Sequence, residues 1–170
     1  LLTMTDRRPL LCAIFDAAVA AAHPDVVLSA HLRPAPKGRV ICLAAGKGAA
    51  AMAAAAERHY LDELGLDPTR LTGIATTRHG HGVPTRRIKV IEAGHPVPDE
   101  AGLKAADDTL RLAAPLADHI VGLHARYGTL QLKLKDEKAA IASLNKALAI
   151  DPDLADAQVN LLNVLIGQNK

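Results

Sequence analysis

A short apolar run that breaks at a glycine turn and resumes as an alanine-rich segment constrains the fold of this chain most. Residues 40–45 carry no charge, Gly46-Lys47-Gly48 follow at once, and residues 49–57 contain only Ala, Met and Glu. This order predicts a buried strand, a tight turn and a helix whose first N–H groups face the turn. The turn would therefore present backbone donors and the Lys47 ammonium to an anion.

The rest of the first two thirds of the chain alternates between helical and strand patterns. The glycine at position 65 would end the alanine-rich helix. Further helices are predicted over 8–22 and from Asp99 or Glu100 to 112, and further strands over 71–76 and 88–93. Strands and helices in this order indicate an α/β domain, a Rossmann-like layered structure on a parallel sheet.

After Pro115 the strand signals fade and the pattern is helical. Small residues and a closing proline recur in this tail, at Gly128, Ala140, Ala147 and Pro152. Their spacing resembles the tetratricopeptide pattern, and it predicts helices over 138–150 and 153–166. We therefore expect an α/β domain over 1–120 and a tetratricopeptide-like helical hairpin over 121–170. Because so few repeats cannot bury their own faces, the tail is expected to cap the first domain, self-associate or contact another protein.

Composition narrows the classes of partner. The chain has one Phe, two Tyr and no Trp, and a formal net charge of +2, so a stacking surface or a strongly basic face for nucleic acid is not expected. It contains no apolar run of 18 residues and no secretion signal, so we expect a cytoplasmic protein without a membrane partner. Cys12 and Cys42 lie in apolar stretches and are expected to be small core residues.

The glycine turn admits three interpretations. It lacks the spacing of a Walker A loop, but Gly46, Gly48 and Ala51 fit the loose dinucleotide pattern G-x-G-x-x-A. Arg78 stands where an acid for the ribose would be expected. A glycine turn without a ligand is the second interpretation. The third is an anion site, favoured because a lysine at the positive end of a helix is unfavourable unless an anion is bound there.

Two polar loops should emerge beside this turn. The segment 77–84 follows one predicted strand and 92–100 ends the next, so both should lie at the carboxyl edge of a parallel sheet. Their histidines, His79, His81 and His95, lack the cysteines or spaced carboxylates that would complete a metal site, and no metal is expected. We expect His79 and His95 to order the loops or touch substrate, and Asp99 to cap its helix. The candidate substrate- or phosphate-binding residues are Gly46, Gly48, His79 and His95.

Three segments together resemble the N-terminal part of the glycerate 2-kinase family. They are Ala45-Gly-Lys-Gly-Ala-Ala-Ala-Met, Thr77-Arg-His-Gly-His-Gly-Val-Pro and Glu92-Ala-Gly-His-Pro-Val-Pro-Asp-Glu-Ala-Gly-Leu, within about residues 8–120. The resemblance implies phosphorylation of glycerate with ATP and Mg²⁺ as cofactors. It also implies that Lys47 is catalytic and steadies negative charge on glycerate or on the transferred phosphoryl group.

The chain departs from the family pattern after Leu123. Residues 118–123 resemble the strand that leads, in the family, to a Ser-Gly-Gly-Gly-Ser phosphate loop, but residues 124–128 replace that loop. We therefore expect a truncated kinase domain that lacks the downstream half of its site and is impaired in catalysis. The alternative is a non-catalytic α/β module whose helical tail contacts proteins.

Overall fold

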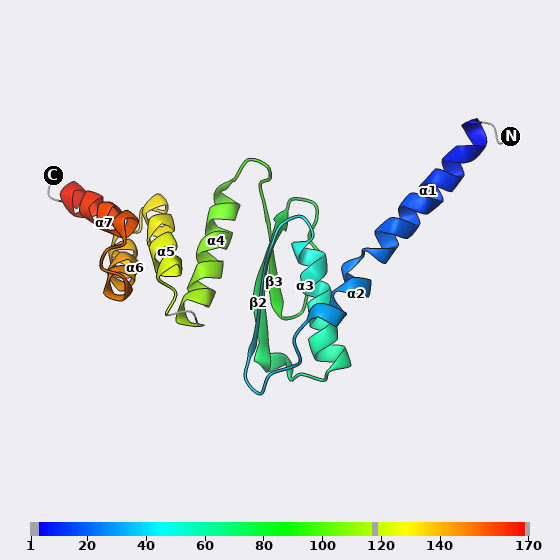
Figure 1. Ribbon diagram of the computed structural model, residues 1–170, viewed down its shortest axis with the longest axis horizontal. Helices are drawn as coiled ribbons and strands as arrows, with labels where there is room; N and C mark the ends of the chain where they lie inside the picture. Colours follow the sequence, from blue (N-terminus) through cyan, green and yellow to red (C-terminus); the bar gives the residue numbers. More distant parts are fainter. Residues whose placement is uncertain (1–3, 117–118, 169–170) are drawn as a thin grey trace. The chain divides into compact units, whose positions relative to one another are not determined.

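The computed structural model describes residues 4–116 and 119–168, which form two compact units, residues 1–92 and 93–170. The first unit is built on a three-stranded sheet in the order β1 (Val40–Ala45), β2 (Leu71–Arg78), β3 (Ile88–Ala93), the last residue of β3 opening the second unit. The strands occupy the runs predicted from the sequence, with β2 two residues longer at its end. The predicted α/β class is confirmed (Figure 1).

All three strands run in the same direction. β1 pairs with β2 in parallel, Val40 opposite Leu71 and Ala45 opposite Thr76. At the amino end of β3 the Arg87 Nε donates to the carbonyl oxygen of Leu71 at 3.4 Å, so β2 and β3 also begin together. Residues 79–87 connect them without a helix and return the chain to the amino end of the sheet.

Helix α3 (Ala49–Glu57), extended by the π-helical turn η2 (Arg58–Glu63), covers one face of this sheet (Figure 1). Its alanines let the helix approach closely, and Ala49 and Ala53 are buried against Ala75 of β2 and Ile88 of β3. A second cluster joins Tyr60 of η2 to Val40 and Leu71 at the other end of the strands. The 3-10 turn η3 (Pro68–Arg70) leads into β2.

The N-terminal segment contains α1 (Met4–Ala21), α2 (Pro24–Val27) and the 3-10 turn η1 (Ser29–His31). The helix predicted here is present, but the expectation that Cys12 is a core residue is wrong, because its side chain is exposed. Its neighbours Leu11 and Phe15 are 64% and 67% exposed, so this face of α1 is not packed on the core. Cys42, in contrast, is partly buried in the sheet.

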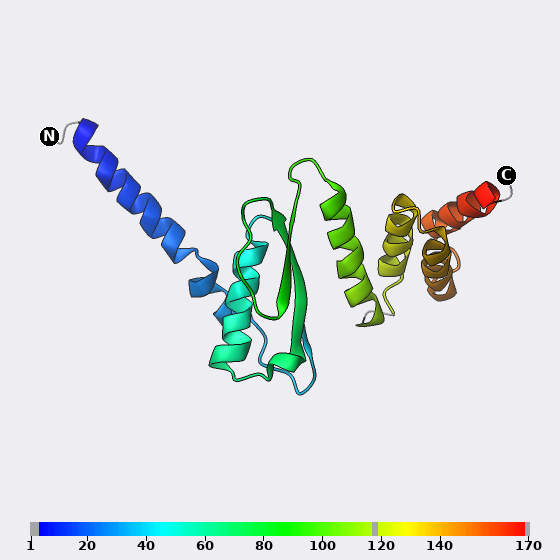
Figure 2. The ribbon, with the colours of Figure 1, turned by 180° about the vertical axis from the view of Figure 1, so that it is seen from behind.

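The second unit is helical. It contains α4 (Glu100–Ala113), the 3-10 turn η4 (Ala114–Leu116), α5 (Val121–Lys133), α6 (Glu137–Ile150) and α7 (Ala155–Gln168). Figures 1 and 2 show α5, α6 and α7 next to one another, and their core contains Ala125, Leu144, Ala147 and Ala157. The predicted helical tail is thus present. Its identity as a tetratricopeptide repeat and the boundary between 120 and 121 stay predictions.

The resemblance of residues 118–123 to a strand is not matched by the structure where it describes them. Ile120 is the residue before α5, and Val121, Gly122 and Leu123 form its first turn. Leu123 N donates to the Ile120 carbonyl at 3.0 Å, which closes that turn. A four-residue apolar run fits a buried strand and a helix equally well, and here the helical sequence that follows decides the outcome.

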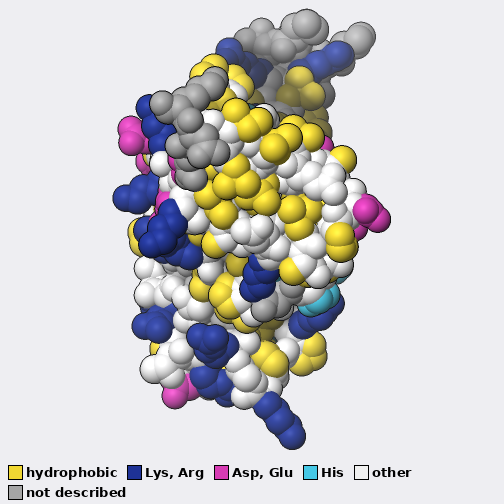
Figure 3. Space-filling model, turned by 90° about the vertical axis from the view of Figure 1, so that its left-hand side faces the viewer, with side chains coloured by type: hydrophobic (Ala, Val, Ile, Leu, Met, Phe, Trp, Pro, Cys, Tyr) yellow, Lys and Arg dark blue, Asp and Glu magenta, His cyan; other side chains and the backbone are white. Residues whose placement is uncertain are grey.

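Apolar side chains also gather on an outer face of the second unit (Figure 3). The exposed residues of α7 include Val159, Leu162, Leu165 and Ile166.

Within the described residues, no helix has the length and apolar character needed to cross a membrane.

Candidate anion-binding site at the carboxyl edge of the sheet

The glycine turn between β1 and α3 has the geometry that the sequence predicts. Gly46 has a φ of +131°, a conformation that a side chain would strain, and its N–H donates to the Thr76 carbonyl of β2 at 3.0 Å. Gly48 is the N-cap of α3 and offers no side chain to the N–H groups of the first helical turn. The Ala49 N–H donates to the Gly46 carbonyl at 3.1 Å, and the other N–H groups of this turn, at the positive end of the helix, suit an anionic ligand.

Lys47 is held at its backbone and exposed at its side chain. The Thr77 hydroxyl donates to the Lys47 carbonyl at 3.2 Å, and Thr77 itself is buried. This contact ties the turn to the end of β2. The backbone of Lys47 is therefore fixed at the carboxyl edge of the sheet, and its side chain is accessible to a ligand from solvent.

The loop after β2 wraps around a carboxylate at the end of β3. Glu92 Oε1 accepts the N–H of Gly82 at 2.6 Å, and the amides of Gly80 and His81 also point to this carboxylate. A Cβ at position 82 would lie 2.6 Å from the same oxygen, so a side chain there would displace the carboxylate from this contact. Gly80 supplies the left-handed bend with a φ of +74°.

These bonds fix the charge of Glu92. The Gly82 amide, and next the Gly80 amide, hold its pKa below the ordinary value, because both donate to the ionised form. The nearby His79 and the His81 amide act in the same direction, and partial burial opposes them. Glu92 is thus an anion that organises the loop carrying His79.

The structure brings most of the predicted site residues to one edge, with one exception. Gly46, Lys47 and Gly48 follow β1 and His79 follows β2, whose carboxyl ends lie side by side. The side chains of Lys47 and His79 are both exposed. His95 belongs to the second unit, where it follows β3 and is exposed. The binding and catalytic roles of these residues stay predictions.

The segment around His95 is itself tightly built. A side chain at Gly94 would come within 2.5 Å of the Val97 carbonyl oxygen, so only glycine fits the turn. Asp99 caps α4 as predicted: its Oδ1 accepts the Gly102 N–H at 2.8 Å.

Sequence reasoning missed two residues that shape the edge, Thr77 and Glu92. Glu92 stands as an acid in the otherwise apolar second half of its strand, and that contrast was the available signal. Thr77 carried no comparable signal. Nowhere in the described ranges do three His, Cys, Asp or Glu side chains cluster as a metal site would require.

A family model described as "Domain of unknown function (DUF4147)" matches residues 10–123, about two thirds of the chain. The chain belongs to this family. The domain is found in glycerate 2-kinase family members. The match includes the glycine turn, the 79–82 loop and the segment around His95.

Individual relatives carry two kinds of name. An Agrobacterium vitis protein named "putative hydroxypyruvate reductase" is 47% identical over 100 residues, 59% of this chain and 22% of that protein. The D-glycerate 2-kinase of Thermotoga maritima is 30% identical over 142 residues, 82% of this chain and 33% of its own length. A crystal structure of glycerate kinase from Thermotoga maritima, 29% identical, matches 62% of this chain and 24% of its own, with a TM-score of 0.46. The chain spans a third or less of the length of these relatives.

Proposed function

We propose that the carboxyl end of β1 together with the Gly46-Lys47-Gly48 turn, here called the Lys47 edge, forms part of a glycerate 2-kinase site. The glycerate carboxylate or the transferred phosphoryl group would bind there. The observation that carries the proposal is the exposed Lys47 beside the uncapped first turn of α3. An ammonium next to the N-terminus of a helix favours a small anion.

The proposed reaction is phosphoryl transfer from ATP to a hydroxyl of glycerate. ATP supplies the phosphoryl group, and Mg²⁺ offsets the charge of its phosphate oxygens when it is bound. Lys47 would stabilise negative charge that grows on the phosphoryl oxygens or remains on the carboxylate. The N–H groups of the first turn of α3 would orient the same anion, and Glu92 would hold the His79 loop beside it.

The metal is assigned no protein ligand. The described residues offer no carboxylate cluster, and the Glu92 carboxylate is already engaged by backbone amides. Phosphoryl transfer uses several positioned cations. The Lys47 edge supplies only some of these cations. We therefore propose that this chain binds the substrate but catalyses phosphoryl transfer slowly.

Calorimetric titration with glycerate and with Mg-ATP tests the proposal. We expect saturable binding that Lys47→Ala weakens about tenfold or more, because a charge-assisted contact to an anion contributes about 1.5–3 kcal/mol. Lys37→Ala is the matched control, since Lys37 is also exposed and lies in the loop before β1. Equal affinities of the Lys47→Ala variant and the unchanged protein would overturn the role of Lys47. Formation of ADP and phosphoglycerate in a coupled assay reports turnover separately.

A second candidate function rests on the name of the Agrobacterium vitis relative. Gly46, Gly48 and Ala51 fit the dinucleotide pattern, and Arg78 ends β2 where it could meet a 2′-phosphate. Under this alternative, the turn would hold NADPH, which would supply the hydride for reduction of hydroxypyruvate. Fluorescence titration with NADPH separates the two: binding of NADPH without binding of ATP would favour the reductase. Absence of binding by either nucleotide and by glycerate would favour a non-catalytic module.

A further inference from the structure

The strand that precedes the glycine turn lies at an edge of the sheet. Within the described residues, β1 pairs only with β2, so the outer row of its N–H and C=O groups has no strand partner. All six of its residues are apolar, and Leu43 is 43% exposed. Edge strands are commonly protected by charged side chains, prolines or bulges. β1 contains no charged residue and no proline.

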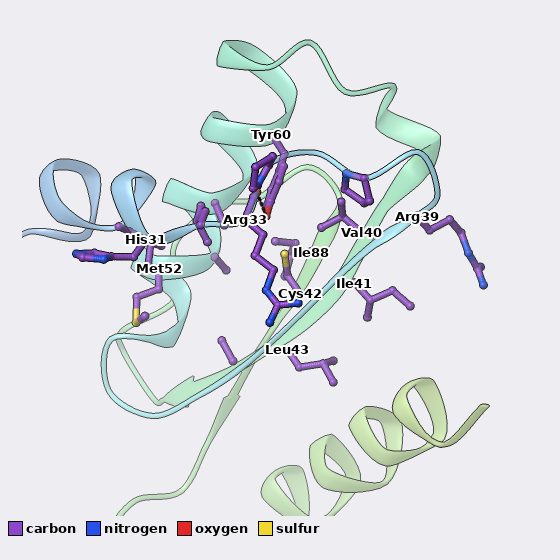
Figure 4. Close-up of a pocket in the computed structure, with 17 residues that line it drawn as sticks. His31, Arg33, Arg39, Val40, Ile41, Cys42, Leu43, Met52, Tyr60 and Ile88 are labelled. Carbon is purple, nitrogen blue, oxygen red and sulfur yellow. Dashed lines mark hydrogen bonds between the residues drawn. The ribbon is translucent and has the colours of Figure 1, made fainter. Parts of the chain in front are cut away.

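A groove of about 600 Å³ runs beside this edge. Its wall on the strand side is Arg39 to Ala44 with Ile88 of β3, and its other wall is formed by α3, η2 and residues of the 28–36 segment. Figure 4 shows Ile41 and Leu43 on one side of β1 and Cys42 on the other, with Met52 of α3 across the groove. Most of the residues that line the groove are thus apolar, and the groove follows the strand.

The shape and the hydrogen-bonding groups select an extended occupant. The free row of an edge strand satisfies its donors and acceptors with the backbone of another strand, and apolar pockets then take alternate side chains. A helix satisfies its own backbone and would leave the β1 groups without partners. The groove therefore fits a peptide segment in β conformation.

The charges select the chemistry of that segment. His31, Arg33 and Arg39 line the groove, and within the described residues no Asp or Glu lines it. Arg33 extends from the 28–36 segment toward β1 (Figure 4). Two copies of this chain paired edge to edge would bring two basic rims together, which is unfavourable. A segment with acidic ends would instead meet these cations.

We propose that the β1 groove is a docking site for an extended segment of another protein, apolar in its middle and acidic at its ends, which adds to the sheet as a strand beside β1. The main-chain bonds give the affinity, and Arg33 and Arg39 select the acidic ends. This docking site is separate from the Lys47 edge, since it runs along the side of β1 and not beyond its carboxyl end.

Cys42 provides a reporter inside the groove. With Cys12→Ser, it is the single cysteine of the chain, and maleimide labelling then reads its accessibility. Three heptapeptides with blocked termini serve as probes. The Asp peptide has alternating Val and Thr between two terminal Asp residues. The Lys peptide has Lys at both ends instead, and the Pro peptide is the Asp peptide with Pro at its centre. We expect the Asp peptide to slow labelling at least fivefold and to protect the β1 amides from hydrogen exchange. The Lys and Pro peptides should leave both unchanged.

Charge reversal supplies the matched variants. Arg33→Glu combined with Arg39→Glu should transfer the protection from the Asp peptide to the Lys peptide, whereas Lys37→Glu should keep the original preference, because Lys37 does not line the groove. Retained helical circular dichroism establishes that each variant is folded. No protection by the Asp peptide at millimolar concentration would overturn the proposal. Concentration-dependent dimerisation that protects Cys42 without any peptide would overturn it in favour of a second copy.

Discussion

Glu57 is a buried carboxylate that fixes the connection between β2 and β3. It is 3% exposed, and it accepts the N–H groups of Arg86, Arg87 and Ile88 at 2.7, 2.5 and 2.6 Å. The Arg86 guanidinium also lies 3.7 Å from it. Parallel strands are normally connected through a helix. Here the connection has no helix, and the Glu57 side chain from the end of α3 holds it in place.

We expect Glu57→Ala to lower the free energy of unfolding of the first unit by about 3 kcal/mol, because it leaves buried N–H groups without acceptors. Urea denaturation followed by circular dichroism measures the change. Glu63→Ala is the control: Glu63 lies on the adjacent turn, is 59% exposed and pairs with His59, so we expect a change below about 1 kcal/mol. Equal losses in the two variants would contradict the structural role of Glu57.

Glu92 makes the order of the 79–82 loop depend on pH. Its pKa in the folded protein lies below the ordinary carboxyl value of 4.5, so the fold favours its ionised form. The contribution is fully present above pH 4.5 and is lost as the pH falls through the lower, folded pKa. The electrostatic effect of the nearby His79 lowers the pKa of Glu92 in the same direction as the amides.

Amide hydrogen exchange of Gly80 and Gly82, measured across acidic pH, tests this dependence. We expect protection at neutral pH that persists to about pH 4.5 and disappears below it. Glu92→Gln should remove the step in the profile, while Glu100→Gln, an exposed acid of the next helix, should keep it. A step that survives in the Glu92→Gln variant would assign the titration to another group.

At the scale of elements, sequence patterns located the strands because each one is a short segment rich in apolar or β-branched residues between turn residues. They also placed the turn at Gly46, because a φ of +131° needs glycine. They did not reveal that Glu92 binds the loop before its own strand, since that contact depends on strand register. They misplaced residues 120–123, because so short a run carries no periodicity of its own. They predicted α1 correctly but not the exposure of Cys12, because a helical pattern does not predict which part of the protein packs against the helix.

Gly128 sets the distance between α5 and α6. A Cβ at this position would lie 2.7 Å from Leu144 Cγ, and Leu144 is fully buried. We expect Gly128→Ala to destabilise the second unit by about 1–3 kcal/mol through overpacking, although alanine favours a helix. Gly122→Ala in the same helix is the control, because nothing lies near its Cβ and the substitution should stabilise by up to about 1 kcal/mol. Thermal unfolding of both variants gives the signs, and stabilisation by Gly128→Ala would refute close packing here.

At the scale of the whole molecule, the two compact units have separate hydrophobic clusters. Tyr60 belongs to a cluster of the first unit, and the second unit has its own around Leu144. The chain contains two tyrosines and no tryptophan, and Tyr127 is buried in the second unit. Each unit therefore carries one intrinsic fluorophore.

Single-tyrosine variants use this distribution to ask whether the units unfold independently. With Tyr127→Phe, the fluorescence of Tyr60 reports the first unit, and with Tyr60→Phe, that of Tyr127 reports the second. We expect Glu57→Ala to lower the free energy of unfolding that the Tyr60 signal reports. The free energy reported by Tyr127 should change by less than about 0.5 kcal/mol, because the altered contacts share no partner. Gly128→Ala should do the reverse. If both signals moved together in both variants, the chain would unfold as one cooperative structure, and each unit would depend on the other for its stability.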